Sequence, residues 1–511
     1  MYDQHEGRWK YMKIGKLFRL LSIVFVLIVL TSCADNVGHT FPTLDISDTS
    51  VVASSIIDPS SEVRGVWIAS VFNINYPSRA DLDADTLRAE IDSILASCEK
   101  NDLNTVFFQV RPSCDALYES ELFPVSRSLS TSGELTFDPL RYLLTEAHRK
   151  NIFVHAWVNP LRITVAADSE GKLPEDSPAV KHPEWTVKYA DGKLYFNAGI
   201  PELRTFVAEG VREIVEKYDV DGVVFDDYFY PYPVSGAEFD DAEEFARYGE
   251  GYESIGDFRR DNINKLVKEV YDIVKSTDSE CRFGVAPAGV WQNNDGYNGG
   301  SDTRGFEAYS EIYCDALAWV DGGYVDYISP QIYWQIGKSG TPYDTVADWW
   351  NSRLDGTGVE LWISHGVYRY DKDDWGDASG EMASQVKYGR ELMSYRGSVF
   401  YGYDKLRDDV FGVTGELNDV YKYEIIYCDP AVSGKGVSFV SPYIGAECPI
   451  GELTVEGMSD PSRELKLDGA SIGRQRDGSF SVTVDVAEGE NRFTFTQGES
   501  RYILTVYGTE D

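Results

Sequence analysis

Eight short apolar runs, each followed by a longer amphipathic stretch, occupy the chain from about residue 62 to 415. The runs lie at 64–70, 105–110, 153–159, 222–226, 283–286, 327–331, 361–366 and 399–403. Short apolar runs of this kind are typical of strands buried on both faces. Between them apolar residues recur every three or four positions, as in Leu87, Ile91, Ile94, Leu95 and Cys98, which predicts amphipathic helices. Eight strand–helix units in series predict an α/β fold, a closed (β/α)8 TIM barrel over 62–415.

A different pattern follows the predicted barrel. After a connecting segment at 416–445, residues 446–511 hold short alternating runs at 452–455, 464–467, 479–484, 492–496 and 502–506, separated by glycine and aspartate turns. Alternation over four to eight residues predicts a small all-β sandwich. Its turns, such as Asp477-Gly478-Ser479-Phe480, resemble those of bacterial Ig-like modules. We expect this module to act as a spacer rather than to bind ligand.

The N-terminus has the features of a targeting segment. A basic region is followed by an apolar run at 20–30, which is shorter than the roughly 20 residues of a spanning helix. The run ends in Leu30-Thr31-Ser32-Cys33, which resembles a bacterial lipobox. We therefore predict a signal peptide over 1–33, a lipidated Cys33, a flexible tether over 34–61 and a location in the bacterial cell envelope, facing the outer membrane or periplasm. Ordinary cleavage near Ser32 and an uncleaved anchor are the alternatives.

Composition narrows the classes of partner. The formal net charge of −37 disfavours nucleic acid and anionic lipid, so the lipid anchor is the only membrane contact that we expect. The 33 tyrosines and 11 tryptophans fit either carbohydrate binding or a large barrel core. The seven cysteines show no spacing typical of a metal site. We expect a monomer with no metal and no cofactor.

Polar and aromatic side chains follow nearly every predicted strand. In a (β/α)8 barrel all these strand ends open on one face, where enzymes of this fold keep their sites. Amide, phenol, indole and carboxylate groups together suit a polyol ligand, although each residue alone could equally be structural. The candidate binding residues are Arg111, His155, Trp157, Asn159, Arg162, Tyr228, Tyr230, Trp291, Gln331, Tyr333, Trp334, His365, Tyr368 and Tyr403.

The run from Asp221 to Pro233 carries the candidate chemistry. It changes abruptly from apolar residues to the adjacent carboxylates Asp226 and Asp227. In a regular strand neighbouring side chains point to opposite faces, so both can serve one site only if the strand end bends. We expect Asp226 to act as nucleophile or base, and Asp227 as its charge partner or as the acid. A helix cap or a loop ion pair is the structural alternative for this pair.

Hydrolysis of a glycosidic bond normally uses two carboxyl groups, about 5 Å apart for retention or about 6.5–9.5 Å apart for inversion. Asp115 and Asp302 are further candidates for the acid. No glutamate follows a predicted strand directly, which counts against this chemistry. The sequence leaves open which carboxylate is the acid and whether configuration is retained.

Six separated blocks resemble the glycosyl hydrolase-like family 10 of bacterial envelope lipoproteins. The blocks are Arg64-Gly65-Val66-Trp67, Gln109-Val110-Arg111-Pro112 with Asp115-Ala116-Leu117-Tyr118, Ala156-Trp157-Val158-Asn159-Pro160, Phe225-Asp226-Asp227-Tyr228-Phe229-Tyr230-Pro231, Ser329-Pro330-Gln331-Ile332-Tyr333-Trp334 and His365-Gly366-Val367-Tyr368-Arg369. The resemblance covers roughly 62–420. It implies a barrel glycosidase acting on glycan strands, with peptidoglycan favoured. We expect Arg111 to pair with a carboxylate or to hold a substrate anion such as a lactyl group, and a salt bridge at the barrel mouth is the structural alternative. Ser113-Cys114 departs from the pattern, which leaves the shape of that loop in doubt.

Two functions from different classes therefore stand side by side. The first is a glycoside hydrolase that cleaves an amino-sugar glycan of the cell envelope. The second is a glycan-binding or scaffold lipoprotein that keeps the barrel without its chemistry. A metal-dependent deacetylase is a weaker third idea, because the sequence offers no closely spaced histidine and aspartate ligands.

Overall fold

The structure is a computed structural model that describes residues 62–371, 375, 378–423, 437–442, 446–459, 464–474, 479–497 and 500–509. The predicted signal peptide, Cys33 and the tether lie outside the described residues. Within the described part, no helix combines the length and the hydropathy that a membrane crossing requires.

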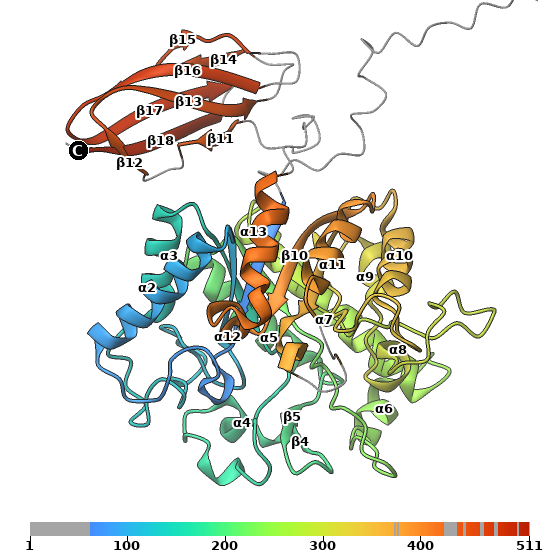
Figure 1. Ribbon diagram of the computed structural model, residues 1–511. Helices are drawn as coiled ribbons and strands as arrows, with labels where there is room; N and C mark the ends of the chain where they lie inside the picture. Colours follow the sequence, from blue (N-terminus) through green and yellow to red (C-terminus); the bar gives the residue numbers. More distant parts are fainter. Residues whose placement is uncertain are drawn as a thin grey trace, which may run out of the picture. The chain divides into compact units, whose positions relative to one another are not determined.

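Eight parallel strands form a closed barrel (Figure 1). They are β1 (Val63–Ile68), β2 (Thr105–Arg111), β3 (Phe153–Val158), β6 (Gly222–Phe225), β7 (Arg282–Val285), β8 (Tyr327–Ile328), β9 (Glu360–Gly366) and β10 (Tyr395–Tyr401). The barrel closes where β1 pairs with β10 on one side and with β2 on the other. The predicted (β/α)8 fold is confirmed. The sixth strand is shorter than its apolar run, since Pro330 has no N–H to donate to a ladder.

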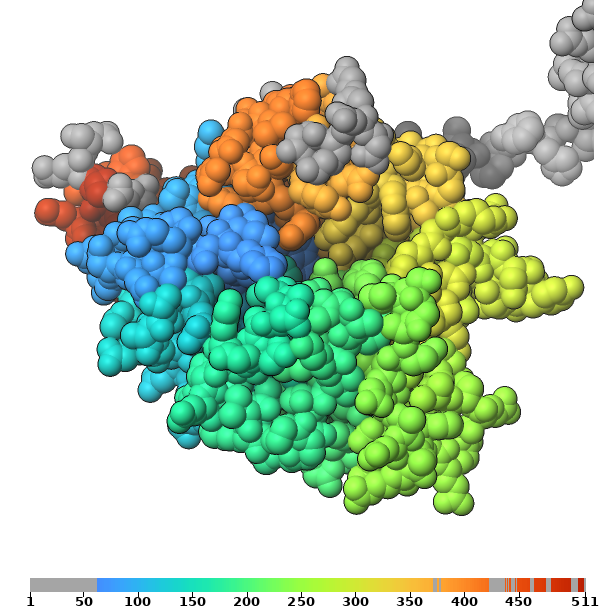
Figure 2. All heavy atoms as spheres, turned by 90° about the horizontal axis from the view of Figure 1, so that it is seen from below, coloured from blue at the N-terminus to red at the C-terminus, as the bar shows by residue number. Residues whose placement is uncertain are grey.

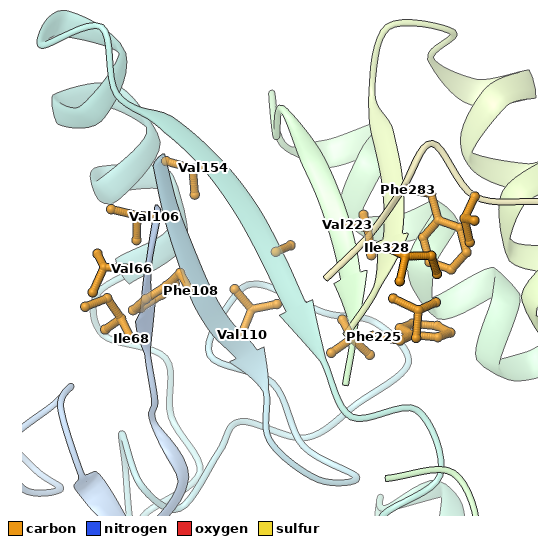
Figure 3. Packing of buried hydrophobic residues seen from close by; sticks show 14 of the residues in the cluster. Val66, Ile68, Val106, Phe108, Val110, Val154, Val223, Phe225, Phe283 and Ile328 are labelled. Atoms are coloured by element: carbon orange, nitrogen blue, oxygen red, sulfur yellow. The ribbon is translucent and has the colours of Figure 1, made fainter. Parts of the chain in front are cut away.

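Helices surround the barrel as amphipathic layers (Figure 1). They include α2 (Ala84–Lys100), α3 (Pro139–Arg149), α5 (Pro201–Lys217), α7 (Ile255–Thr277), α9 (Ala316–Gly322), α10 (Tyr343–Leu354), α11 (Glu381–Arg390) and α13 (Val413–Tyr423). Alternate strand residues such as Val106, Phe108, Val223 and Phe225 point outward into a large apolar core (Figure 3). The buried leucines and isoleucines of α2 belong to this core, as its sequence pattern predicted.

The barrel interior is filled by a second, aromatic cluster. Trp67, Phe107, Trp157, Tyr327 and Trp362 belong to it. Glycines on neighbouring strands make room for these rings. A Cβ on Gly284 would lie 2.2 Å from the ring of Tyr327, closer than atoms can approach. The floor of the barrel is therefore packed and closed.

The long insertions gather at one end of the barrel, the mouth, where the carboxyl ends of the strands open (Figure 1). They hold α4 (Pro178–Lys181), the hairpin β4 (Thr186–Lys188) and β5 (Leu194–Phe196), α6 (Ala242–Tyr248), α8 (Ala308–Glu311) and α12 (Tyr403–Arg407). These loops follow β3, β6, β7 and β10, so they surround the side chains at the carboxyl ends of the strands.

The barrel extends beyond the predicted boundary at residue 415. Helix α13 reaches Tyr423, and its Val413, Leu417, Val420 and Tyr421 belong to the barrel core. At the other end of the barrel sequence, the buried Glu62 accepts hydrogen bonds from Arg390 of α11 at 2.8 and 2.7 Å. Arg390 also donates to the carbonyl oxygen of Val420 at 3.1 Å. Arg390 thus joins the start of β1 to α11 and α13.

The C-terminal region forms two sheets. The order in the first is β11 (Val437–Ser441), β13 (Gly451–Ser459), β16 (Ser479–Val486). The order in the second is β12 (Ala446–Pro449), β18 (Ser500–Thr509), β17 (Gly489–Gln497), β14 (Leu465–Leu467), β15 (Ala470–Ser471). Because β11 pairs with β13, the sheets begin inside the segment 416–445 that we expected to be a connection. The all-β character is confirmed, and the Ig-like assignment stays a prediction.

Replacing Glu62 with alanine should lower the free energy of unfolding of the barrel by about 3–5 kcal/mol, because the Arg390 charge would be left buried without its partner. Their side chains are 1% and 6% exposed. Urea unfolding followed by tryptophan fluorescence measures the barrel, since no tryptophan lies beyond residue 423.

The control is Asp85→Ala, which breaks an ion pair with Arg88 whose side chains are 95% and 45% exposed and should change stability by less than about 0.5 kcal/mol. The double variant Glu62→Ala/Arg390→Met should lose less than the sum of the single losses. Additive losses would contradict the coupling.

Candidate active site

Strand β6 delivers Asp226 and Asp227 to the mouth on a bent chain. Val224 packs in the barrel interior, so alternation turns Asp226 inward as well. The strand ends at Phe225, and the chain bends at Asp227, where the N–H of Phe229 donates to the carbonyl oxygen of Asp227 at 2.9 Å. The bend meets the condition set by the sequence, because it lets the second carboxylate stay at the mouth.

Asp226 is 4% exposed and is held by side chains of β3 and the residue after it. Its Oδ2 accepts a hydrogen bond from the indole of Trp157 at 3.2 Å and another from the amide of Asn159. Its Oδ1 accepts a single hydrogen bond, from the N–H of Tyr228 at 3.2 Å. Gln109 of β2 in turn donates to Asn159 at 2.7 Å. The orientation of Asp226 is therefore set by two neighbouring strands.

Asp227 is 3% exposed and uses a separate set of donors. The amide of Gln331 donates to its Oδ1 at 3.1 Å, and the phenol of Tyr232 donates to its Oδ2. Gln331 also donates to the carbonyl oxygen of Ala286 at 2.9 Å, which fixes the amide between the ends of β7 and β8. Each member of this carboxylate pair, Asp226 and Asp227, thus has its own support.

Burial raises the pKa of both carboxyl groups. For Asp226 burial is the largest cause and the negative charge of Asp227 the second, and together they raise its pKa from the ordinary 3.8 to about 7. Burial also raises the pKa of Asp227, although the hydrogen bonds from Tyr232 and Gln331 oppose it. A carboxyl group that titrates near neutral pH can give and take a proton under working conditions.

Arg162 supplies positive charge at the same mouth. Its charge lowers the pKa of Asp226 and of Asp227. The guanidinium is positioned by a hydrogen bond from its Nε to the carbonyl oxygen of Pro112, at 2.8 Å, and by the ring of Tyr228, whose centre lies 5.0 Å away. Arg162 therefore opposes the effect of burial on the pair.

Tyrosines line the rest of the mouth. The rings of Tyr333 and Tyr401 stack at 5.9 Å, and Tyr368 meets both edge-on at 5.6 and 5.5 Å. Tyr228 and Tyr232 are 38% and 40% exposed. Burial raises the pKa of Tyr333, and the neighbouring Tyr401 and Tyr368 and then the two carboxylates of the pair raise it further. This wall offers rings and hydroxyls next to the carboxylate pair.

Figure 2 looks onto the molecule from below the view of Figure 1, that is, onto the mouth side. The insertion after β3 (teal to green) forms one bank, and the segments after β9 and β10 (orange) form the opposite bank. The surface is hollowed between them. The loop after β1 (blue) closes one end of this furrow.

A family model described as glycosyl hydrolase-like 10 matches residues 62–375, which is more than half of the 511-residue chain. This chain belongs to the glycosyl hydrolase-like 10 family. The matched residues contain the carboxylate pair and all of its donors, so the site belongs to the part that the family shares.

Relatives of this glycosyl hydrolase-like protein carry hydrolase names. Glycosyl hydrolase YngK of Bacillus subtilis strain 168 is 38% identical over 368 residues, which are 70% of this chain and 72% of YngK. Glycosyl hydrolase DigH of Escherichia coli strain K12 is 35% identical over 373 residues, 68% of this chain and 84% of DigH. Among solved structures, the glycoside hydrolase domain of PgaB (BpsB) from Bordetella bronchiseptica aligns with a TM-score of 0.49 at 12% identity, over 71% of this chain and 99% of that chain.

In this glycosyl hydrolase-like 10 protein Arg111 does not reach the mouth, so its expected role as an anion ligand is wrong. It is 1% exposed and lies over the ring of Phe123, 4.3 Å from the ring centre. A Cβ on Gly210 of α5 would come within 2.4 Å of its Nη1. The β2–β3 register shifts between Gln109 and Arg111, which turns Arg111 outward under the helices.

Neither histidine is a rim residue, contrary to the expectation. His155 is 3% exposed inside the barrel, one side-chain layer below Trp157, and bonds to the phenol of Tyr327 at 2.8 Å. His365 is fully buried on the outer face of β9, where it forms hydrogen bonds with Gln385 and Ser398 at 2.8 Å each. Burial lowers the pKa of His365 to about 4. It is therefore neutral and structural.

Four predicted binding residues have the surroundings of core side chains. Tyr230 and Tyr403 are each 3% exposed. Trp291 is 9% exposed, and its indole donates to Asp315 at 3.2 Å. Trp334 is partly buried against the same core. Aromatic type and position after a strand did not separate these rings from Tyr333 and Tyr368, because both sets are needed in a barrel of this size.

The two other acid candidates lie in different surroundings: burial raises the pKa of Asp115, as it does for the pair, whereas Asp302 is exposed. Asp115 accepts hydrogen bonds from Ser113 at 2.8 Å and from Ser126 at 2.7 Å, so it ties together the loop after β2. The side chain of Asp302 is 81% exposed, with Arg304 at 3.7 Å, which makes it unsuited to the acid role that we expected. Among the described residues no three His, Cys, Asp or Glu side chains are arranged to hold a metal.

Three mouth residues were absent from the sequence-based selection: Gln109, Tyr232 and Tyr401. Each lies at or just after a strand, where a signal was available. Gln109 was hidden because a polar residue inside a buried run is most often structural. The sequence could not distinguish Tyr232 and Tyr401 from the tyrosines next to them. The bend after β6 and the register of β10 decide that these two side chains lie at the mouth.

Asp226→Asn should gain stability relative to the wild type as the pH rises from about 4 to about 7. In that range the wild-type carboxyl is ionised in the unfolded chain but still protonated in the fold, because its folded pKa is raised to about 7. The wild type therefore loses up to about 1.4 kcal/mol per pH unit, roughly 4 kcal/mol in all, which the variant does not lose.

Urea midpoints by tryptophan fluorescence at pH 4 to 8 measure this difference. Asp302→Asn, a change at an exposed carboxylate, serves as the control and should show none. A constant offset between Asp226→Asn and the wild type across this range would show that the pKa of Asp226 is not raised.

Proposed function

We propose that this protein is a glycoside hydrolase of the bacterial cell envelope that cleaves an amino-sugar glycan, with peptidoglycan strands as the substrate. The observation that carries the proposal is the buried carboxylate pair at the mouth, with raised pKa values and separate donors. Membership of the glycosyl hydrolase-like 10 family supports it. The envelope location rests on the lipobox-like Leu30-Thr31-Ser32-Cys33, through which a lipid on Cys33 would hold the enzyme.

The surroundings of the pair favour Asp226 as the general acid. Its Oδ2 is occupied by the two donors Trp157 and Asn159, which leaves Oδ1, with its single donor, to carry the proton. Its pKa near 7 keeps that proton available at neutral pH. Asp227 keeps its charge more easily, because Tyr232 and Gln331 donate to it. These roles reverse the expectation drawn from the sequence.

In the reaction, Asp226 gives its proton to the glycosidic oxygen as the bond between that oxygen and the anomeric carbon breaks. Asp227 either attacks the anomeric carbon or removes a proton from the attacking water. Both routes consume one water and release two sugar hydroxyls. In the first, water attacks the covalent intermediate and gives its proton to Asp226. In the second, the water proton stays on Asp227, and exchange with solvent restores the proton on Asp226 and the charge on Asp227. The tyrosine wall next to the pair suits sugar rings, since aromatic faces stack on their C–H surfaces.

Asp226→Asn and Asp227→Asn should each reduce the release of soluble fragments from purified peptidoglycan glycan strands by at least about 100-fold, since each removes an acid–base group. Reversed-phase chromatography of the reduced products measures the release, and the control is Asp302→Asn, with activity within twofold of the wild type. Undiminished release by both variants would remove the pair from the chemistry. Binding of strands by a wild type that releases nothing would favour the non-catalytic glycan-binding alternative.

Arg162→Gln should move the acidic limb of the pH profile of kcat/KM to higher pH. Arg162 lowers the pKa of both carboxyl groups, so its loss raises them, and the essential carboxylate then ionises only at higher pH. Arg304→Gln is the matched control, because the side chain of Arg304 is 70% exposed beside Asp302. An unchanged limb in Arg162→Gln would show that Arg162 does not tune the pair.

A further inference from the structure

The loop after β1 carries an exposed phenylalanine in an unusual backbone conformation. Phe72 is 66% exposed, with φ 55° and ψ 20°, and Asn73 follows with φ 54°. This left-handed region crowds the Cβ of every residue except glycine. An apolar ring in water and a strained backbone both cost free energy, and such outliers gather at ligand-binding positions.

The conformation of Phe72 is enforced by its surroundings. The side chain of Asn73 donates to the carbonyl oxygens of Pro77 at 2.9 Å and Ser128 at 2.8 Å. Asn75 accepts a hydrogen bond from the N–H of Ala69 at 2.9 Å. The loop is thus a built turn with Phe72 at its exposed position.

The same turn is connected to the carboxylate pair. Gln109 Oε1 accepts the N–H groups of Ser70 and Val71, each at 2.9 Å, and the amide of Gln109 donates to Asn159, which donates to Asp226. Val71 packs against the aromatic cluster inside the barrel, as Tyr401 does. Strands β1 and β10 are neighbours, so the turn after β1 lies at the mouth next to the end of β10, which carries Tyr401.

We propose that Phe72 is a stacking platform for one sugar ring of the glycan, at a subsite outside the carboxylate pair. This inference rests on the proposed function for the identity of its ligand. The phenyl ring of Phe72 can stack on the C–H face of a pyranose. Because it has no hydroxyl group, it needs no hydrogen-bond partner. Gln109 then sets the distance between this subsite and Asp226, because it bonds directly to the turn and, through Asn159, to Asp226.

A platform outside the pair acts on binding of long chains and leaves short ones unaffected. The experiment uses the Asp226→Asn protein as an inactive host, so that binding is measured without cleavage. Isothermal titration calorimetry with N-acetylglucosamine oligomers of two and six units compares Phe72→Ala, Phe72→Trp and Ile74→Ala in that host. Ile74 is the matched control, since it is 50% exposed in the same loop but has no ring.

Phe72→Ala should weaken binding of the six-unit oligomer about tenfold and leave the two-unit oligomer within twofold. Phe72→Trp should retain the affinity, and Ile74→Ala should change it by less than twofold. Equal binding of the six-unit oligomer by Phe72→Ala and its host overturns the platform, as do equal losses in Phe72→Ala and Ile74→Ala or equal losses for both oligomers.

The outcomes also separate this inference from the proposed function. If Phe72→Ala weakens binding as expected but the wild type cleaves no glycan, the role of Phe72 as a platform is supported and the proposed hydrolase function is overturned. Cleavage that depends on Asp226, together with binding that ignores Phe72, removes the platform alone. A host that binds neither oligomer overturns the platform, whereas peptidoglycan cleavage by the wild type would still sustain the hydrolase.

Discussion

Two carboxylic acids on consecutive residues are buried together at the mouth of a closed barrel, and much of the site serves to make that burial tolerable. Asp226 and Asp227 are 4% and 3% exposed. Unpartnered, two such charges would disfavour folding. The barrel supplies donors from two strand ends, Trp157 and Asn159 at the end of β3 and Gln331 after β8, and one positive charge, that of Arg162. These contacts do not offset the whole cost of burial, so the pKa values of both carboxyl groups stay raised. The proposed chemistry uses these raised pKa values.

The layers of side chains in the barrel explain why the two carboxyl groups have raised pKa values at the mouth. Below the pair the interior is closed by aromatic rings such as Phe107 and Trp362, which exclude water from one side of Asp226. Above it the mouth opens to partly exposed tyrosines. A group at this boundary keeps a low-dielectric floor while a ligand can approach from above. The helices and the Glu62–Arg390 pair hold this boundary in place without touching it.

Three arginines show that environment, rather than residue type, assigns the role. Arg390 is buried with Glu62 and joins parts of the barrel. Arg111 is buried over Phe123, outside the strands. Arg162 lies at the mouth and acts on both carboxyl groups of the pair. An acidic chain of net charge −37 thus places a cation where its own carboxylates are most crowded.

The order of eight strands and helices, and the choice of Asp226 and Asp227 as centre, could be derived from the chain alone, because periodicity and an abrupt apolar-to-acid change are local properties. The direction of each later side chain could not. A register shift at Gln109 turned Arg111 toward the outside of the barrel. Alternation along the strands placed His365 on the outer face of the barrel and Tyr401 on the inner face. A displacement of one residue reverses the face on which a side chain lies. That displacement depends on which strands pair and where the chain bends, so only the assembled barrel decides it.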